Sequence, residues 1–128
     1  MIRNARKRGI LVLSGSDTGN AYAFAHGKWH GKEAELFVNE VGMTPMEAIL
    51  ANTSRNAWLI GLQDEIGVIA PGKLADIVIW NSDPLADITA LQRPDEISAI
   101  IKDGRIVDRE AAGGFLQLGE EPSRAGVR

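Results

Sequence analysis

The sequence has no cysteine and only two histidines among its 128 residues. Without cysteine the chain has no disulfide framework, no thiolate zinc site and no cysteine nucleophile. A metal site in this chain would therefore depend on histidine and carboxylate side chains.

Long apolar runs and an excess of basic residues are also missing. The longest apolar runs are far shorter than the roughly 20 residues that a membrane helix requires, and residues 1–8 do not resemble a secretory signal. The net charge is −3, and the basic cluster at residues 3–8 is typical of a solvated helix face. The sequence thus predicts a cytoplasmic protein with no membrane or nucleic-acid partner.

What the sequence does contain, near its start, is a strand pattern that stops on an acid. Residues 10–13 are continuously apolar, which is typical of a parallel strand buried on both faces. Asp17 follows this run, between Gly15 and Gly19. Reactive groups of α/β barrels stand at the carboxyl ends of such strands. Asp and Gly are also common turn residues, so a turn is the alternative interpretation.

The loop expected at residues 18–31 holds both histidines, His26 and His30. It is longer than most connections, which is typical of a binding loop or of mobile surface. The four-residue spacing would place both rings on one helix face as metal ligands. However, Gly27 and Gly31 are expected to interrupt a helix, and no His-Glu-x-x-His pattern is present. A histidine metal pair is therefore not predicted.

Helical patterns flank this region. The last turn of a helix is expected at residues 4–8, with Gly9 as its stop. An apolar stripe predicts a helix at residues 33–41, and a short third helix is expected to end near Ile60. Between these two, the chain carries a capping box whose parts are Thr44 at the N-cap, Pro45 at the first position and Glu47 at the third. The inward side chains expected in that helix are Met46, Ile49 and Leu50.

After Gly61 the pattern changes to short strands separated by turns. Strands are predicted at residues 66–70, 75–80, 97–102 and 105–108. The last two flank Asp103 and Gly104, a two-residue hairpin signal. A polar excursion with one helical turn near residues 87–91 lies between them and the earlier strands, and residues 111–128 are expected to fray.

Several motifs follow one another in unbroken order between residues 9 and 108. They are Gly-Ser-Asp-Thr-Gly at 15–19, Gly-Met-Thr-Pro at 42–45, Asn-Ala at 56–57 and Gly-Val-Ile-Ala-Pro-Gly-Lys-Leu-Ala-Asp at 67–76. This ordered set resembles the C-terminal third of the amidohydrolase superfamily, and within it the imidazolonepropionase and Xaa-Pro dipeptidase-like branch.

The resemblance implies an α/β fragment of a larger fold. Residues 1–61 would supply the last strand and helices of a (β/α)8 barrel. Residues 62–110 would supply the C-terminal strands of a small β-sandwich, and residues 111–128 would form a tail.

The resemblance also implies a function, in which Asp17 is a metal ligand and general base for hydrolysis of an amide or related C–N bond. The substrate would be a dipeptide or a cyclic amide, and the metal a divalent cation, zinc above all. His30, or in its place His26, would contact the substrate near the mouth of the site. The His-x-His pair and the other metal ligands of the family are missing from this chain. We therefore expect no tightly held metal and no activity from the chain alone.

A second interpretation is a non-catalytic remnant or interaction module. Sandwich strands without their partner strands leave unpaired edges, which are templates for pairing with another chain. Assembly through such edges would produce a homo-oligomer.

Overall fold

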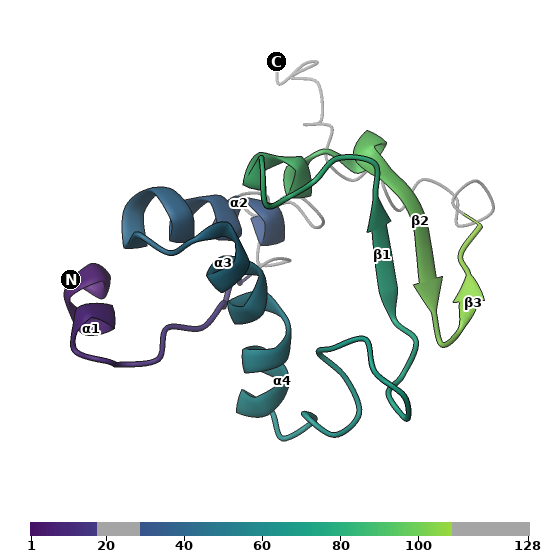
Figure 1. Ribbon diagram of the computed structural model, residues 1–128, viewed down its shortest axis with the longest axis horizontal. Helices are drawn as coiled ribbons and strands as arrows, with labels where there is room; N and C mark the ends of the chain where they lie inside the picture. Colours follow the sequence, from purple (N-terminus) through teal and green to yellow (C-terminus); the bar gives the residue numbers. More distant parts are fainter. Residues whose placement is uncertain (18–28, 109–128) are drawn as a thin grey trace, which may run out of the picture.

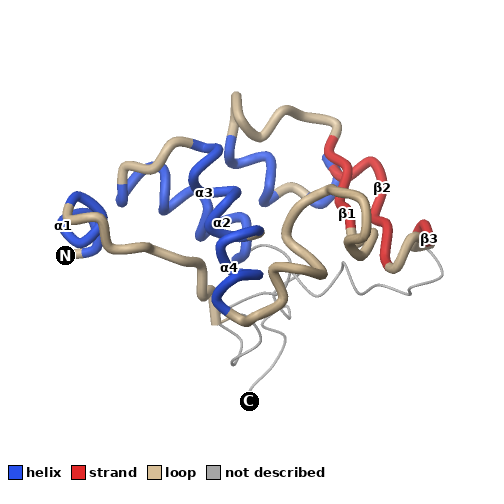
Figure 2. The backbone as a smooth tube through the Cα atoms, turned by 60° about the horizontal axis from the view of Figure 1, so that its bottom comes forward, coloured by secondary structure: helices blue, strands red, loops and turns tan. Residues whose placement is uncertain are grey.

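The computed structural model describes residues 1–17 and 29–108. Within these residues the helices lie on one side and a three-stranded antiparallel sheet on the other (Figure 1). Figure 2 shows the same arrangement in a turned view, with the sheet at one end. No helix in the described ranges is long and apolar enough to cross a membrane. His26 and the expected tail fall outside the described ranges.

The helical side is built from five consecutive segments. They are α1 (Ile2–Lys7), α2 (Trp29–Leu36), the π-helix η1 (Phe37–Val41), α3 (Pro45–Asn52) and α4 (Ser54–Leu59). The predicted stops Gly9, Gly42 and Gly61 all have positive φ, from 76° to 79°. Left-handed backbone of this kind is where a helix C-terminus favours glycine.

The helix predicted at residues 33–41 begins earlier, at Trp29, and its last turn is a π-helix. The expectation that Gly31 would interrupt a helix was wrong, because Gly31 lies inside α2 and is buried. A Cβ atom at this position would come within 2.2 Å of the carbonyl oxygen of Leu91. Gly31 therefore serves close packing of α2 against the segment that contains Leu91, although glycine weakens a helix interior.

The capping box of α3 is confirmed. The Thr44 hydroxyl accepts a hydrogen bond from the Glu47 backbone N–H at 3.2 Å, and the Glu47 carboxylate accepts one from the Thr44 N–H at 2.8 Å. The inward face matches the prediction in part: Ile49 packs against the core, but Met46 is 47% exposed, and the completely buried residues are Ala48 and Ala51. Small side chains at the contact let α3 approach its helical neighbours closely, and Met46 points to solvent from the first turn.

We expect the Thr44→Ala variant to lose about 1 kcal/mol of unfolding free energy, since the Glu47 N–H loses its acceptor at the helix start. Urea unfolding of the parent and the variant measures this difference. Thr44→Ser keeps the hydroxyl and is expected to unfold like the parent. Equal stability of the alanine variant and the parent would show that the cap is redundant.

The first helix packs on the start of α3 through an ion pair. Arg6 Nη2 lies 2.6 Å from Glu47 Oε1, and Arg3 Nε donates to the backbone carbonyl of Glu40 at 2.9 Å. The predicted solvated basic face is thus partly engaged in tertiary contacts. The Thr44 backbone N–H and then the Arg6 guanidinium lower the pKa of Glu47 from 4.5 to about 2.

This lowered pKa predicts a pH-dependent contribution of Glu47 to stability. A carboxyl whose pKa is lower in the folded chain stabilises the fold while it is ionised. The contribution is therefore complete above about pH 4.5 and is lost as the pH falls towards about 2. Urea unfolding of the parent and of Glu47→Gln across this range should give a stability difference that shrinks with falling pH. A constant difference would contradict the assignment.

The sheet consists of β1 (Ile77–Trp80), β2 (Ile97–Lys102) and β3 (Arg105–Ile106), in the order β1-β2-β3. In the antiparallel β1–β2 pair, Ile77 lies opposite Ile101. The hairpin at Asp103 and Gly104 is confirmed, with φ of 52° and 73°. Positive φ at both central residues is the signature of a type I′ turn.

The polar excursion before β2 contains two 3₁₀ helices, η2 (Ile88–Gln92) and η3 (Pro94–Glu96). Asp87 caps η2 by accepting a hydrogen bond from the Thr89 N–H at 3.0 Å. The predicted helical turn is therefore present. η2 packs on α2 and supplies Ile88 to the hydrophobic core. The buried members of this core are Ala34, Phe37, Val41, Met43, Ala48, Ala51 and Ile88.

Two predicted strands are not strands. Residues 10–13 are irregular, and Ile10 and Leu11 are about half exposed, at 58% and 48%. An apolar run forms a buried strand only when neighbouring strands satisfy its backbone, and in the described part of the chain no strand pairs with it. Residues 66–70 form a loop in which Gly67, at φ 95°, packs against α4. The barrel and sandwich assignments remain predictions.

Candidate functional site

Asp17 lies at the end of the irregular segment that follows Gly9. Its φ is 50°, in the left-handed region, and its side chain is exposed. Residues other than glycine adopt this conformation infrequently, and where they do, the surrounding contacts maintain it. We therefore describe the hydrogen bonds of residues 14–16, which directly precede Asp17.

Glu33, in the second turn of α2, makes the most extensive of these contacts. Its Oε1 and Oε2 atoms lie 2.9 and 3.1 Å from the Gly15 backbone nitrogen, whose N–H they accept. Its Oε2 also accepts a hydrogen bond from the Ser14 hydroxyl at 2.8 Å. Hydrogen bonds to an ionised carboxylate are stronger than those between neutral groups. Glu33 thus ties the chain two and three residues before Asp17 to helix α2.

His30 lies one turn before Glu33 on α2. Its Nδ1 atom is 3.0 Å from the Ser16 Oγ atom, so the ring is hydrogen-bonded to the residue next to Asp17. Of the three predicted site residues, the structure thus places His30 against the residue that precedes Asp17. The third, His26, lies outside the described ranges.

Asn56 of α4 holds the same segment from another side. Its Nδ2 atom donates to the Ser14 carbonyl at 3.1 Å. Its Oδ1 atom is buried and accepts no hydrogen bond from the described residues. The segment before Asp17 is thus attached to two helices, α2 and α4.

The donor atoms around Asp17 do not make a complete metal site by themselves. Residues 1–17 and 29–108 contain no group of three or more histidine, cysteine, aspartate or glutamate side chains placed to hold a metal ion. A hydrolytic zinc site typically uses about three protein ligands. Within the described part of the chain, Asp17 is a single donor, and a cation there would need ligands from elsewhere.

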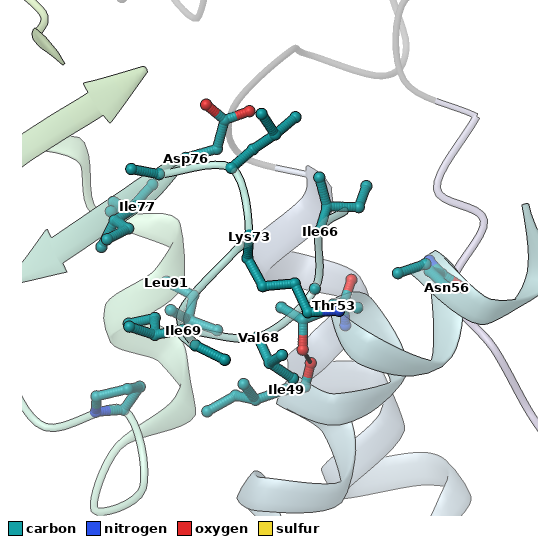
Figure 3. Close-up of a pocket in the computed structure, with 18 of the residues that line it drawn as sticks. Ile49, Thr53, Asn56, Ile66, Val68, Ile69, Lys73, Asp76, Ile77 and Leu91 are labelled. Carbon is teal, nitrogen blue, oxygen red and sulfur yellow. Dashed lines mark hydrogen bonds between the residues drawn. The ribbon is translucent and has the colours of Figure 1, made fainter. Parts of the chain in front are cut away.

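A separate apolar cavity of about 840 Å³ lies between α3, α4, the loop at residues 66–76 and β1 (Figure 3). Val68 of the loop lies beside Ile49 of α3, and Lys73 extends across the cavity towards α4. Asn56 lines this cavity, but Asp17 does not. The carboxylate that lines this cavity is that of Asp76.

Sequence reasoning missed Glu33 and Asn56. Glu33 was expected to begin a helix, where a carboxylate is normally solvated. With the helix starting at Trp29, His30 and Glu33 are three residues apart and share a face. This spacing, together with the Gly-Ser-Asp motif, could have indicated that Glu33 lies near Asp17.

Comparison with known proteins supports an enzyme family. Residues 1–107 match the model of the Amidohydrolase family. The chain is 31% identical to an ochratoxinase from Aspergillus niger over 121 residues, which is 94% of this chain and 24% of that protein. It is 49% identical to an imidazolonepropionase from Pyrobaculum arsenaticum over 47 residues, which is 37% of this chain and 12% of that protein.

Solved structures of hydrolases are also similar to this chain. The chain is similar to a Xaa-Pro dipeptidase with bound methionine, at a TM-score of 0.72 and 34% identity, over 84% of this chain and 24% of that one. It is similar to a molinate hydrolase at a TM-score of 0.76 and 30% identity, over 99% of this chain and 30% of that one. The chain therefore spans about a quarter of the length of these proteins.

Proposed function

We propose that this chain, which belongs to the amidohydrolase family, is the C-terminal part of a metal-dependent hydrolase. The bond cleaved is an amide or related C–N bond in a small molecule, a dipeptide or a cyclic amide. The dipeptidase and imidazolonepropionase likenesses support this substrate class. In the whole enzyme, the described residues contribute Asp17 and the wall around it.

The observation that carries this proposal is the geometry of Asp17. Its carboxylate is exposed, and the segment leading to it is hydrogen-bonded to α2 and α4. An exposed carboxylate that follows a hydrogen-bonded segment is suited to take a proton from the attacking water and return it to the leaving nitrogen. His30, which is hydrogen-bonded to Ser16 beside it, would contact the substrate in this proposal.

A divalent cation, zinc in this proposal, would lower the pKa of the attacking water. Asp17 would be one of its ligands, and the others would come from parts of the enzyme that the described residues do not include. The role of Asp17 as proton acceptor requires only that its carboxylate stay ionised and near the water.

We expect the 128-residue chain alone to lose zinc on dialysis and to hydrolyse no dipeptide, since a single carboxylate donor does not make a closed site. Metal analysis after dialysis and an assay with Xaa-Pro dipeptides measure both properties. Stoichiometric zinc together with activity that disappears in Asp17→Asn would show a self-contained site and contradict the expectation.

The proposed function itself is tested in a chimera. Residues 9–108 replace the matching segment of the Xaa-Pro dipeptidase, and the dipeptidase lacking that segment is the control. Hydrolysis of a Xaa-Pro dipeptide by the chimera and not by the control supports the proposal. A folded, metal-loaded chimera without hydrolysis would oppose it.

An interaction module is the second candidate, and exposed apolar residues on the sheet favour it. Val78 and Ile79 of β1 are 46% and 45% exposed, and Ile106 of β3 is 78% exposed. Such apolar strands are suited to pairing with another chain. Sedimentation of the purified chain over a concentration series separates the two candidates, because this module predicts stable self-association and the enzyme part does not require it.

A further inference from the structure

We propose that Glu33 is a positioning residue for Asp17, acting through the backbone of residues 14–17. This inference rests on the proposed function, in which Asp17 is the proton acceptor. Neither the sequence motifs nor the likenesses to known proteins assigned a role to Glu33.

The contacts of Glu33 are concentrated on one segment. Both carboxylate oxygens accept the Gly15 N–H, and Oε2 also accepts the Ser14 hydroxyl. Among the described residues Glu33 takes part in no salt bridge, in contrast to Glu35 and Glu47. A helix carboxylate that only provides solubility would face water or a basic neighbour. Glu33 instead directs both oxygens to the chain two residues before the acid.

Helix α2, which carries Glu33, is itself fixed in the fold. Gly31 contacts the Leu91 backbone so closely that no side chain fits between them. The Glu35 carboxylate accepts hydrogen bonds from Lys32 at 2.7 Å and from Gln92 at 2.8 Å. Because these contacts hold α2 against η2, the hydrogen bonds of Glu33 link the segment at residues 14–17 to the packed helices.

The position of this segment matters because Asp17 has a left-handed backbone conformation, with φ at 50°. This conformation is uncommon for residues other than glycine, although Asp tolerates it better than most. Without the Glu33 acceptor, the Gly15 N–H is free to turn towards water, and the direction of the Asp17 carboxylate changes with it. A misplacement of about 1 Å in a reacting group is enough to slow catalysis about 100-fold.

The first arm of the test is an NMR measurement on the full 128-residue chain. The Gly15 amide proton is expected to lie downfield in the parent, to move upfield in Glu33→Ala, and to move less in Glu33→Gln, because the glutamine carbonyl remains an acceptor. Glu40→Ala, which removes an exposed carboxylate on η1, is the matched control and should leave the signal in place. A Gly15 signal that is unchanged in Glu33→Ala overturns the proposal, whatever the enzyme's function is.

The second arm measures kinetics in the dipeptidase chimera. Glu33→Ala is expected to lower kcat at least about 10-fold with little change in KM, and Glu33→Gln to recover much of this loss. Wild-type kcat in a Glu33→Ala chimera that has lost only thermal stability would show a purely structural role and overturn the proposal. If Asp17→Asn leaves turnover unchanged, the proposed function fails instead, and the NMR arm still reports whether Glu33 holds the Gly15 backbone.

Discussion

Turnover of the dipeptidase chimera is expected to fall about 10²- to 10⁴-fold when Asp17 is replaced by Asn, a loss typical of removing a general base. The amide keeps the size of the carboxylate and one acceptor oxygen but cannot accept a proton from water. Substrate binding should change much less, so the loss should appear in kcat and not in KM. Steady-state kinetics on the metal-loaded protein provide both values.

This prediction has two controls. Asp95→Asn makes the same change at an exposed carboxylate of η3 and should leave kcat and KM at the parent's values. Metal content is measured in each variant. Excess zinc should restore turnover if Asp17→Asn has only weakened metal binding, but not if the general base has been lost. Turnover within a few-fold of the parent, with weaker substrate binding, would make Asp17 a binding or turn residue.

The largest expected effect on folding is that of Gly31→Ala. The new methyl group would lie 2.2 Å from the Leu91 carbonyl oxygen and 2.5 Å from its carbon. Both are backbone atoms, so no side-chain rotation relieves the clash, and α2 must separate from η2. We expect a loss of about 3 kcal/mol of unfolding free energy or a failure to fold, the upper range for overpacking a tight contact.

Gly15→Ala is the matched control for this change. A Cβ atom at position 15 meets nothing within 4 Å, and the φ of Gly15 is not positive. The control should unfold close to the parent in urea, while the Gly31 variant unfolds at a much lower concentration. Equal stability of Gly31→Ala and the parent would mean that α2 and η2 do not approach each other in this way.

Features encoded by neighbouring residues were predictable from the sequence. The capping box needs only Thr44, Pro45 and Glu47, and the hairpin needs only two residues that tolerate positive φ. Asp17 was singled out from the strand pattern that stops on an acid and His30 from the family resemblance. The structure shows His30 hydrogen-bonded to Ser16, the neighbour of Asp17, and the roles of both residues stay predictions. Local chemistry determines these elements, and so a single sequence reveals them.

Features that depend on distant partners were predicted incorrectly or missed. The apolar run at residues 10–13 suggested a strand, but strand formation depends on neighbours that composition does not reveal. Gly31 suggested a helix stop, but a side chain at this position is excluded by the Leu91 carbonyl. Leu91 lies 60 positions further along the chain, so the sequence around Gly31 did not reveal this contact. Glu33 was missed for a related reason: its partners Ser14 and Gly15 precede it by 19 and 18 residues.

The contact between α2 and η2 also bears on the order in which the chain folds. The Glu35–Gln92 hydrogen bond joins residues 57 positions apart, and closing such a loop loses more chain entropy than forming the local α3 cap. Long-range contacts of this kind slow folding. We infer that helix α3 forms early, that α2 takes its final place only when η2 arrives, and that the segment at residues 14–17 takes its final conformation among the last events.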